Sequence, residues 1–121
     1  MYCWARFLYL GHENDSVSFG HDGLGCGRTH TEHPGEKGRA TWRTQNYGEI
    51  RVRMVEYSAG YEADHWCSKG HILLCVEGEL GTRLADGSHF ILKPGMSYQV
   101  GDGESPHRSY TKSGAKLFIV D

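Results

Sequence analysis

After residue 31 the chain is a succession of short segments separated at close intervals by turn sequences, and this pattern excludes most folds. Residues 49–54 read Glu-Ile-Arg-Val-Arg-Met. This alternation of polar and apolar residues has a period of two, which indicates a half-buried β-strand. Further strands are expected at 40–44, 71–76, 80–84, 90–93, 97–100 and 116–120, with 107–111 as a weaker candidate.

Turn sequences rich in Gly, Asn, Asp and Pro separate these strands. They lie at 46–48, 77–78, 85–88, 93–95, 101–103 and 112–114. No capped amphipathic stretch of about ten residues or more occurs after residue 31, so helices are not expected there. A chain of 121 residues is long enough for one hydrophobic core. The sequence therefore predicts an all-β domain, as a sandwich, a jelly roll or a small barrel.

The beginning of the chain lacks this regularity. Residues 1–30 mix aromatic and glycine-rich pieces without a sustained period, and residues 20–27 have the composition of a flexible loop. We therefore expect two parts: an irregular N-terminal extension over residues 1–30 and a barrel domain over residues 31–121.

Charge and cysteine usage indicate which kinds of partner and which cellular compartment to expect. The net charge of −2 and the absence of a Lys/Arg cluster argue against a nucleic-acid partner. No stretch approaches the roughly 18 consecutive apolar residues of a membrane helix. Residues 1–10 lack the features of a secretory signal, so a cytoplasmic location is expected. In a reducing cytosol, a cysteine beside histidines is more often a metal ligand or reactive group than half of a disulfide.

The segment 63–71, Ala-Asp-His-Trp-Cys-Ser-Lys-Gly-His, concentrates potential metal ligands. On an extended strand, His65 and Cys67 project to one face, while Asp64 and Trp66 project to the other. A bend at the glycine before His71 would bring this third donor toward the first two. Imidazole and thiolate groups favour zinc, iron or copper over magnesium or calcium.

A fourth donor, His107, lies far along the chain after the turn at residues 101–104. It is expected to reach the same site from a different strand. With three protein ligands a zinc ion keeps an open position for water or substrate, whereas four ligands make a closed, structural site. The spacing leaves both arrangements open.

Other donors form weaker candidates. Cys26, His30 and His33 have plausible ligand spacing, but they begin in the irregular segment and lack a fourth partner. Asp64 is interpreted as a solvated turn residue, with a hydrogen bond to a ligand histidine as the alternative.

Several nearby residues have ordinary structural interpretations. Arg51 and Arg53 form a basic stripe on one strand face, which predicts a solvated surface or a subunit interface. Cys75 shares the strand parity of His71 and is expected to be a buried thiol. Trp66 is expected to pack in the core or at a dimer interface.

These residues resemble the two sequence motifs of the cupins. Gly60, the segment His65–Cys67, His71 and Gly78 follow the spacing of the first motif, in which a glycine precedes His-x-His, a Glu and a second glycine. The segment Gly103–His107 resembles the second motif and implies that His107 is the remaining ligand. Cysteine and histidine stand where that family has its second His and its Glu.

The chain is also similar, more narrowly, to the DHCW-motif cupin fold proteins. The similar stretches are 31–36, 63–67, 93–100 and 115–121. The resemblance therefore runs from residue 31 to residue 121, which is about three-quarters of the chain. The resemblance implies a double-stranded β-helix, that is, a jelly-roll barrel with a metal near its axis, and commonly a homodimer. It does not imply a particular reaction.

Two functions follow as hypotheses, with a bare structural barrel without metal as the third. The first is a metal-dependent enzyme acting on a small molecule in the barrel, with His65, Cys67, His71 and His107 as ligands. The second is a non-enzymatic metal- or ligand-binding cupin, or a redox sensor in which oxidation of the thiolate releases the metal. A donor set without a carboxylate favours zinc, with iron, nickel and copper as alternatives.

A catalytic base is not identified by the sequence. Tyr98 and Glu104 are candidates by position alone.

Overall fold

Strands make up most of the part of the chain that the computed structural model describes, which is residues 17–21, 23 and 29–121. The strands are β1 (Thr29–Pro34), β2 (Arg39–Tyr47), β3 (Ile50–Tyr57), β4 (His71–Gly78), β5 (Leu80–Leu84), β6 (His89–Leu92), β7 (Ser97–Val100), β8 (His107–Tyr110) and β9 (Ala115–Val120). The described residues contain no helix. The predicted all-β class is confirmed, and no described helix could cross a membrane.

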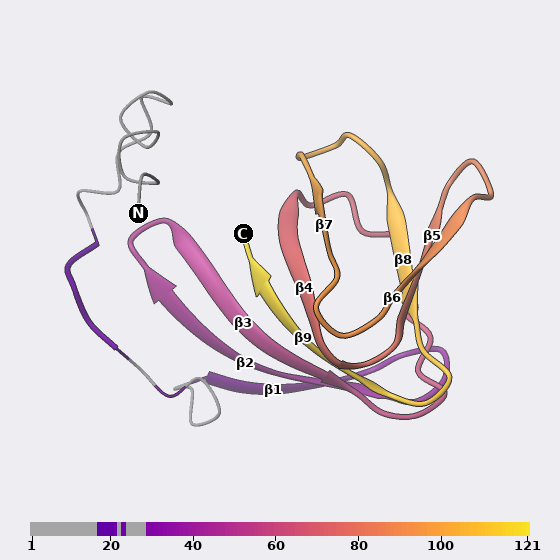
Figure 1. Cartoon of the computed structure of the whole chain (residues 1–121), viewed down its shortest axis with the longest axis horizontal. Coiled ribbons are helices and arrows are strands. Elements are labelled where there is room, and N and C mark those ends of the chain that lie inside the picture. The colour runs from indigo at the N-terminus through magenta and orange to yellow at the C-terminus, as the bar shows by residue number, and fades with distance from the viewer. Residues whose placement is uncertain (1–16, 22, 24–28) are drawn as a thin grey trace.

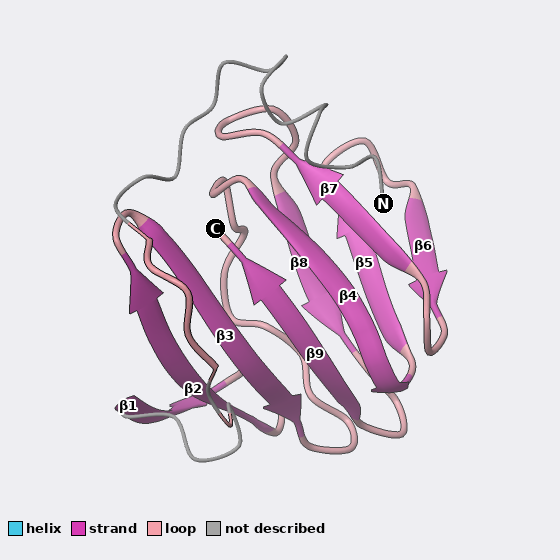
Figure 2. Cartoon of the chain, turned by 60° about the vertical axis from the view of Figure 1, so that its left-hand side comes forward, coloured by secondary structure: helices cyan, strands magenta, loops and turns pink. Residues whose placement is uncertain are grey.

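Two antiparallel sheets face each other. The larger sheet has the order β1-β2-β3-β9-β4-β7, and the smaller one has the order β6-β5-β8. Figure 1 shows the larger sheet curving around one side while β5, β6 and β8 form the opposite wall. Figure 2 shows the smaller sheet lying behind β4 and β7. Neighbours in the larger sheet that are distant in sequence, such as β3 and β9, are typical of a jelly roll.

The first strand was not among the expected ones. It begins at Thr29, two residues before the expected domain boundary, and pairs with β2 over its whole length, from Thr29 opposite Thr44 to Pro34 opposite Arg39. The weaker candidate over 107–111 is confirmed, since β8 covers His107–Tyr110. Most of the segment 1–30, including Cys3 and Cys26, lies outside the described residues.

The core lies between the sheets and is lined by alternate residues of the central strands. In β4, Leu73 and Cys75 are buried, while Ile72 and Leu74 are exposed on the outer face of the sheet. Leu117 of β9 lies beside Cys75 and is also fully buried. The expectation of a buried thiol is confirmed, and burial raises the pKa of Cys75.

The arginines of β3 are placed differently from the expectation. Arg53 lies on the inner face of the sheet with a side chain only 15% exposed, so the predicted solvated surface is wrong for this residue. The reason is Asp121, whose fully buried carboxylate accepts hydrogen bonds from Arg51 Nε at 2.8 Å and Arg53 Nη2 at 2.9 Å. A buried guanidinium is tolerated because the paired carboxylate compensates its charge.

The same arrangement shifts the pKa of the Asp121 carboxyl group. Burial alone would raise the pKa of Asp121, but the hydrogen bond from Arg51 and the charge of Arg53 outweigh burial and hold this pKa below its usual value. The ionised carboxylate is therefore the form that stabilises the fold.

We predict that Asp121→Asn lowers the free energy of unfolding at pH 7 by about 2 kcal/mol, because it leaves Arg53 without its counter-charge. A carboxyl whose pKa is lowered on folding contributes fully above its unfolded pKa and loses that contribution as the pH falls through its folded pKa. Urea unfolding should therefore show that the free energies of unfolding of the parent and the variant become equal as the pH falls below about 4. Equal stability at pH 7 would contradict this role.

Candidate metal centre

A loop and a strand that are distant in sequence meet at the candidate site. The loop residue Cys67 and His107 at the start of β8 form an isolated antiparallel bridge. The N–H of Cys67 donates to the carbonyl of His107 at 2.7 Å, and the N–H of His107 donates to the carbonyl of Cys67 at 3.0 Å. The loop is anchored a second time by the N–H of Ala63, which donates to the carbonyl of Ser109 at 2.9 Å.

His71 enters the site from the other sheet. It is the first residue of β4 and pairs with Val100 at the end of β7. The residue before it, Gly70, donates its N–H to Asp102 Oδ1 at 2.7 Å. The turn after β7 therefore fixes the point at which the loop becomes strand β4.

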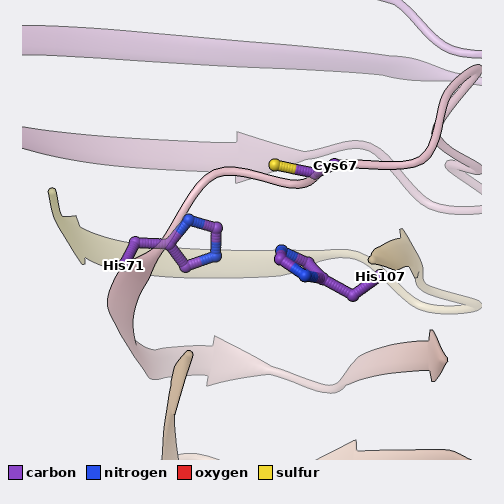
Figure 3. A group of neighbouring side chains, drawn as sticks. All are labelled: Cys67, His71 and His107. Atoms are coloured by element: carbon purple, nitrogen blue, oxygen red, sulfur yellow. The ribbon is translucent and has the colours of Figure 1, made fainter. Parts of the chain in front are cut away.

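Cys67, His71 and His107 offer one donor atom each, and these atoms lie within 4.8 Å of one another. Figure 3 shows the two imidazole rings pointing toward one another, with the thiol beside them. The ring centroids are 4.9 Å apart and the ring planes are perpendicular. His107 is buried and the other two residues are half-buried. Three of the four residues expected as ligands are therefore brought together.

Hydrogen bonding prepares the two imidazoles for a metal. His107 donates from Nδ1 to the carbonyl of Ser105 at 2.8 Å, so its lone pair is on Nε2. His107 Nε2 and His71 Nδ1 are both buried without a hydrogen-bond partner among the described residues. Buried nitrogens are rarely left unpaired, and an ion held by His107 Nε2 would remove the cost for that ring. The donors present therefore fit a divalent transition metal.

The electrostatics also favour an uncharged imidazole at His71. Burial, together with the neighbouring His107, lowers the pKa of His71 to about 4, so this ring is neutral at pH 7. Tyr98 lies with its hydroxyl 3.0 Å from His71 Nε2. Burial raises the pKa of Tyr98, which keeps the phenol protonated.

His65 is not part of this group. The argument that His65 and Cys67 share a face requires an extended strand, but the chain bends at Asp64 and His65. Asp64 was expected to project away from His65, and this was wrong, because His65 Nδ1 lies 2.6 Å from Asp64 Oδ1. The hydrogen bond with His65 lowers the pKa of Asp64. Both residues instead form a separate group with His33.

The donors line a cavity of about 120 Å³ inside the barrel. Its wall includes residues not expected from the sequence as site residues, among them Arg53 and Tyr57 of β3. Strand parity could have indicated them, because both lie on the face of β3 that also carries the buried Val55. Trp66, expected to pack, is 46% exposed and does not belong to the core.

A second pocket of about 400 Å³ lies on the other side of His107, between β7 and the smaller sheet. His107 and Tyr98 line both this pocket and the cavity with the donors. The hydroxyl of Thr82, which also lines the pocket, is buried without a hydrogen-bond partner among the described residues. The apolar part of the wall consists of Leu84, Phe90, Ile91, Leu92, Met96 and Val100.

Solved structures with a similar fold include cupins. An RmlC-like cupin from Shewanella frigidimarina is 18% identical, with a TM-score of 0.61 over 88% of each chain. A sugar phosphate isomerase of the cupin superfamily from Silicibacter pomeroyi is 14% identical, with a TM-score of 0.63 over 84% of this chain and 74% of that one. Fe(II)-HppE with an alternative substrate is 18% identical, with a TM-score of 0.56 over 68% and 49%.

No family model and no curated protein matches the sequence. The structural similarity shows that the chain has the cupin fold, as the two motifs predicted. The narrower resemblance to the DHCW-motif proteins stays a prediction.

We predict that Gly70→Ala lowers the free energy of unfolding by about 1 to 3 kcal/mol, the usual effect of overpacking. A Cβ at this position would lie 2.5 Å from the backbone nitrogen of Asp102 and 2.8 Å from the carbonyl oxygen of Val100. Backbone atoms must then move, which also displaces His71. Thermal unfolding measures the loss of stability, and Zn²⁺ affinity measures the displacement of His71.

Gly101→Ala is the matched control. Its added Cβ would meet the flexible Glu104 side chain, at 3.3 Å from Cγ, and this side chain can move. If both variants behave like the parent, the turn does not position the start of β4.

Proposed function

We propose that the protein is a metal-binding cupin and an enzyme that acts on a small molecule inside the barrel. Cys67, His71 and His107 hold the ion, and three ligands leave one coordination position open. The observation that carries this proposal is the group itself: one donor atom from each of Cys67, His71 and His107 lies within 4.8 Å of the other two, and His107 Nε2 is buried without a hydrogen-bond partner among the described residues. A bare structural barrel offers no reason to gather these donors around an unpaired nitrogen.

Zinc is the metal that we propose. Zinc accepts thiolate and imidazole ligands together, and the group contains no carboxylate. Iron, nickel and copper remain alternatives that elemental analysis separates. A bound zinc ion supplies Lewis-acid chemistry, which polarises a carbonyl or activates water near pH 7.

The chain's own residues form the pocket that would bind the substrate. The apolar pocket of about 400 Å³ adjoins the metal ligands through His107 and Tyr98, so a molecule in it would lie next to the ion. The buried hydroxyl of Thr82 offers one hydrogen bond to a polar group of that molecule. The protonated phenol of Tyr98 is placed to donate a hydrogen bond at the boundary of the two spaces. A mostly apolar substrate with one or two polar groups suits this wall.

A redox-sensing cupin is the second candidate. Cys67 is a free, half-buried thiol, and oxidation of a ligand thiolate would release the metal. This function requires reduced cysteines at rest, in agreement with a cytoplasmic location. Loss of metal on mild peroxide treatment, with no substrate turnover by the loaded protein, would favour the sensor.

We also propose that the chain forms a homodimer through the outer face of the larger sheet. Two cross-strand rows there, Val52–Val120–Ile72 and Met54–Phe118–Leu74, are entirely apolar. Ile72 is 57% exposed in the single chain. The rows end on polar residues, such as Gln99 beside Ile72. An apolar centre with a polar rim is typical of an interface, and a twofold contact lets the same patch serve both copies.

Elemental analysis tests the metal centre. Protein purified without chelators and without added metal should contain about one equivalent of zinc at this site, and Cys67→Ser and His107→Ala should each lose most of it, since each removes a direct ligand. His89→Ala, an exposed histidine on β6, should keep the parent content. A parent without metal would contradict both candidate functions. Full metal content in both ligand variants would show that the ligands are assigned wrongly.

Light scattering tests the homodimer. The parent should have twice the chain mass of 13.6 kDa, and Leu74→Lys should have the mass of one chain, because a charge would be buried in the contact. Lys93→Glu changes the charge of an exposed turn and should leave the dimer intact. A monomeric parent would rule out the interface.

A further inference from the structure

A second group of potential metal ligands lies outside the proposed centre. His33 belongs to β1, and Asp64 and His65 form the bend before Cys67. One donor atom from each of the three residues lies within 4.8 Å of the other two. The proposed function uses none of them.

The carboxylate of Asp64 lies between the two imidazoles. Its Oδ1 is 2.6 Å from His65 Nδ1, and its Oδ2 is 3.4 Å from His33 Nε2. Tetrahedral ligands at zinc distances of about 2.0–2.2 Å lie roughly 3.3–3.6 Å from one another. The separation of 3.4 Å between Asp64 and His33 already matches this value. The separation of 2.6 Å between Asp64 and His65 would have to lengthen by about 1 Å when an ion replaces the shared proton.

The scaffold holds the two segments together. His33 pairs with Ala40 of β2, and its ring packs on Trp42 with centroids 5.9 Å apart. The bend is anchored on one side by Arg108, whose Nε donates to the carbonyl of Ala63 at 2.7 Å. On the other side it is anchored at Cys67, through the bridge to β8. The donors are therefore placed by hydrogen-bonded backbone on both sides.

The group is open to solvent, in contrast to the buried centre. The side chains of His33, Asp64 and His65 are 41%, 41% and 63% exposed. An ion can enter without unfolding, and water would complete its coordination. His33 and His65 also line the cavity of about 120 Å³ that contains the first three donors, so the two groups share one space.

We propose that His33, Asp64 and His65 bind a second divalent transition-metal ion at the mouth of this cavity. Two imidazoles and one carboxylate accept Zn²⁺, Co²⁺, Ni²⁺ or Fe²⁺, and their oxygen donor distinguishes them from the thiolate group inside. The second site does not depend on the proposed function, because it shares no ligand with the centre at Cys67.

Equilibrium dialysis of the full chain against micromolar Zn²⁺ tests the site. The parent should bind two ions, and His33→Ala and Asp64→Asn should bind one, with the second dissociation constant weakened at least about tenfold. His30→Ala is the matched control, because His30 lies on the opposite face of the same strand, beside Arg43. The control should bind two ions. If it loses the second ion, or if His33→Ala keeps both, the assignment is wrong.

Co²⁺ loading separates this proposal from the first one. A thiolate ligand gives cobalt a near-ultraviolet charge-transfer band, and a site of imidazoles and carboxylate does not. Cys67→Ala should lose the band and keep one ion, whereas His33→Ala should keep the band and lose one ion. If the parent binds a single ion that Cys67→Ala abolishes, the second site does not exist. If it binds a single ion that His33→Ala abolishes, the second site stands and the proposed function fails.

Discussion

The site depends on one pair of backbone hydrogen bonds, the bridge between Cys67 and His107. It joins the loop between β3 and β4 of the larger sheet to the first residue of β8 in the smaller sheet, 40 positions further along the chain. Without this bridge, the thiol and the buried imidazole would have no fixed separation. The pairing of His71 with Val100 supplies the third donor from the opposite wall. Three donors from three elements give a site whose geometry the barrel itself maintains.

Burial then determines the chemistry of those donors. It keeps His71 neutral, and the carbonyl of Ser105 selects the tautomer of His107 whose lone pair is on Nε2. The same interior holds Arg53 only because Asp121 neutralises it. The barrel therefore combines a candidate metal site with a compensated ion pair. The adjoining apolar pocket has room for a small molecule, and this is the reason why an enzyme is proposed rather than a structural barrel.

Much of the fold could be predicted from local patterns, because a period of two and turn residues are local properties. The strand over 49–54 was predicted correctly, yet Arg53 faces inward, and this could not be foreseen because its partner Asp121 is about 70 positions away. His65 was grouped with Cys67 on the assumption of an extended chain, whereas the chain bends there. His107 was proposed as a fourth donor from the residues alone, and the resemblance to the second cupin motif strengthened this assignment. Contacts between distant segments, such as the bridge at Cys67, are invisible to spacing alone.

X-ray absorption at the zinc edge tests the central claim, that Cys67, His71 and His107 hold the ion together. Protein loaded with a single equivalent of zinc should show one sulfur neighbour at about 2.3 Å and nitrogen neighbours at about 2.0–2.1 Å. In Cys67→Ala, the sulfur neighbour should disappear. A parent spectrum without sulfur, or a sulfur neighbour that survives in Cys67→Ala, would contradict the claim.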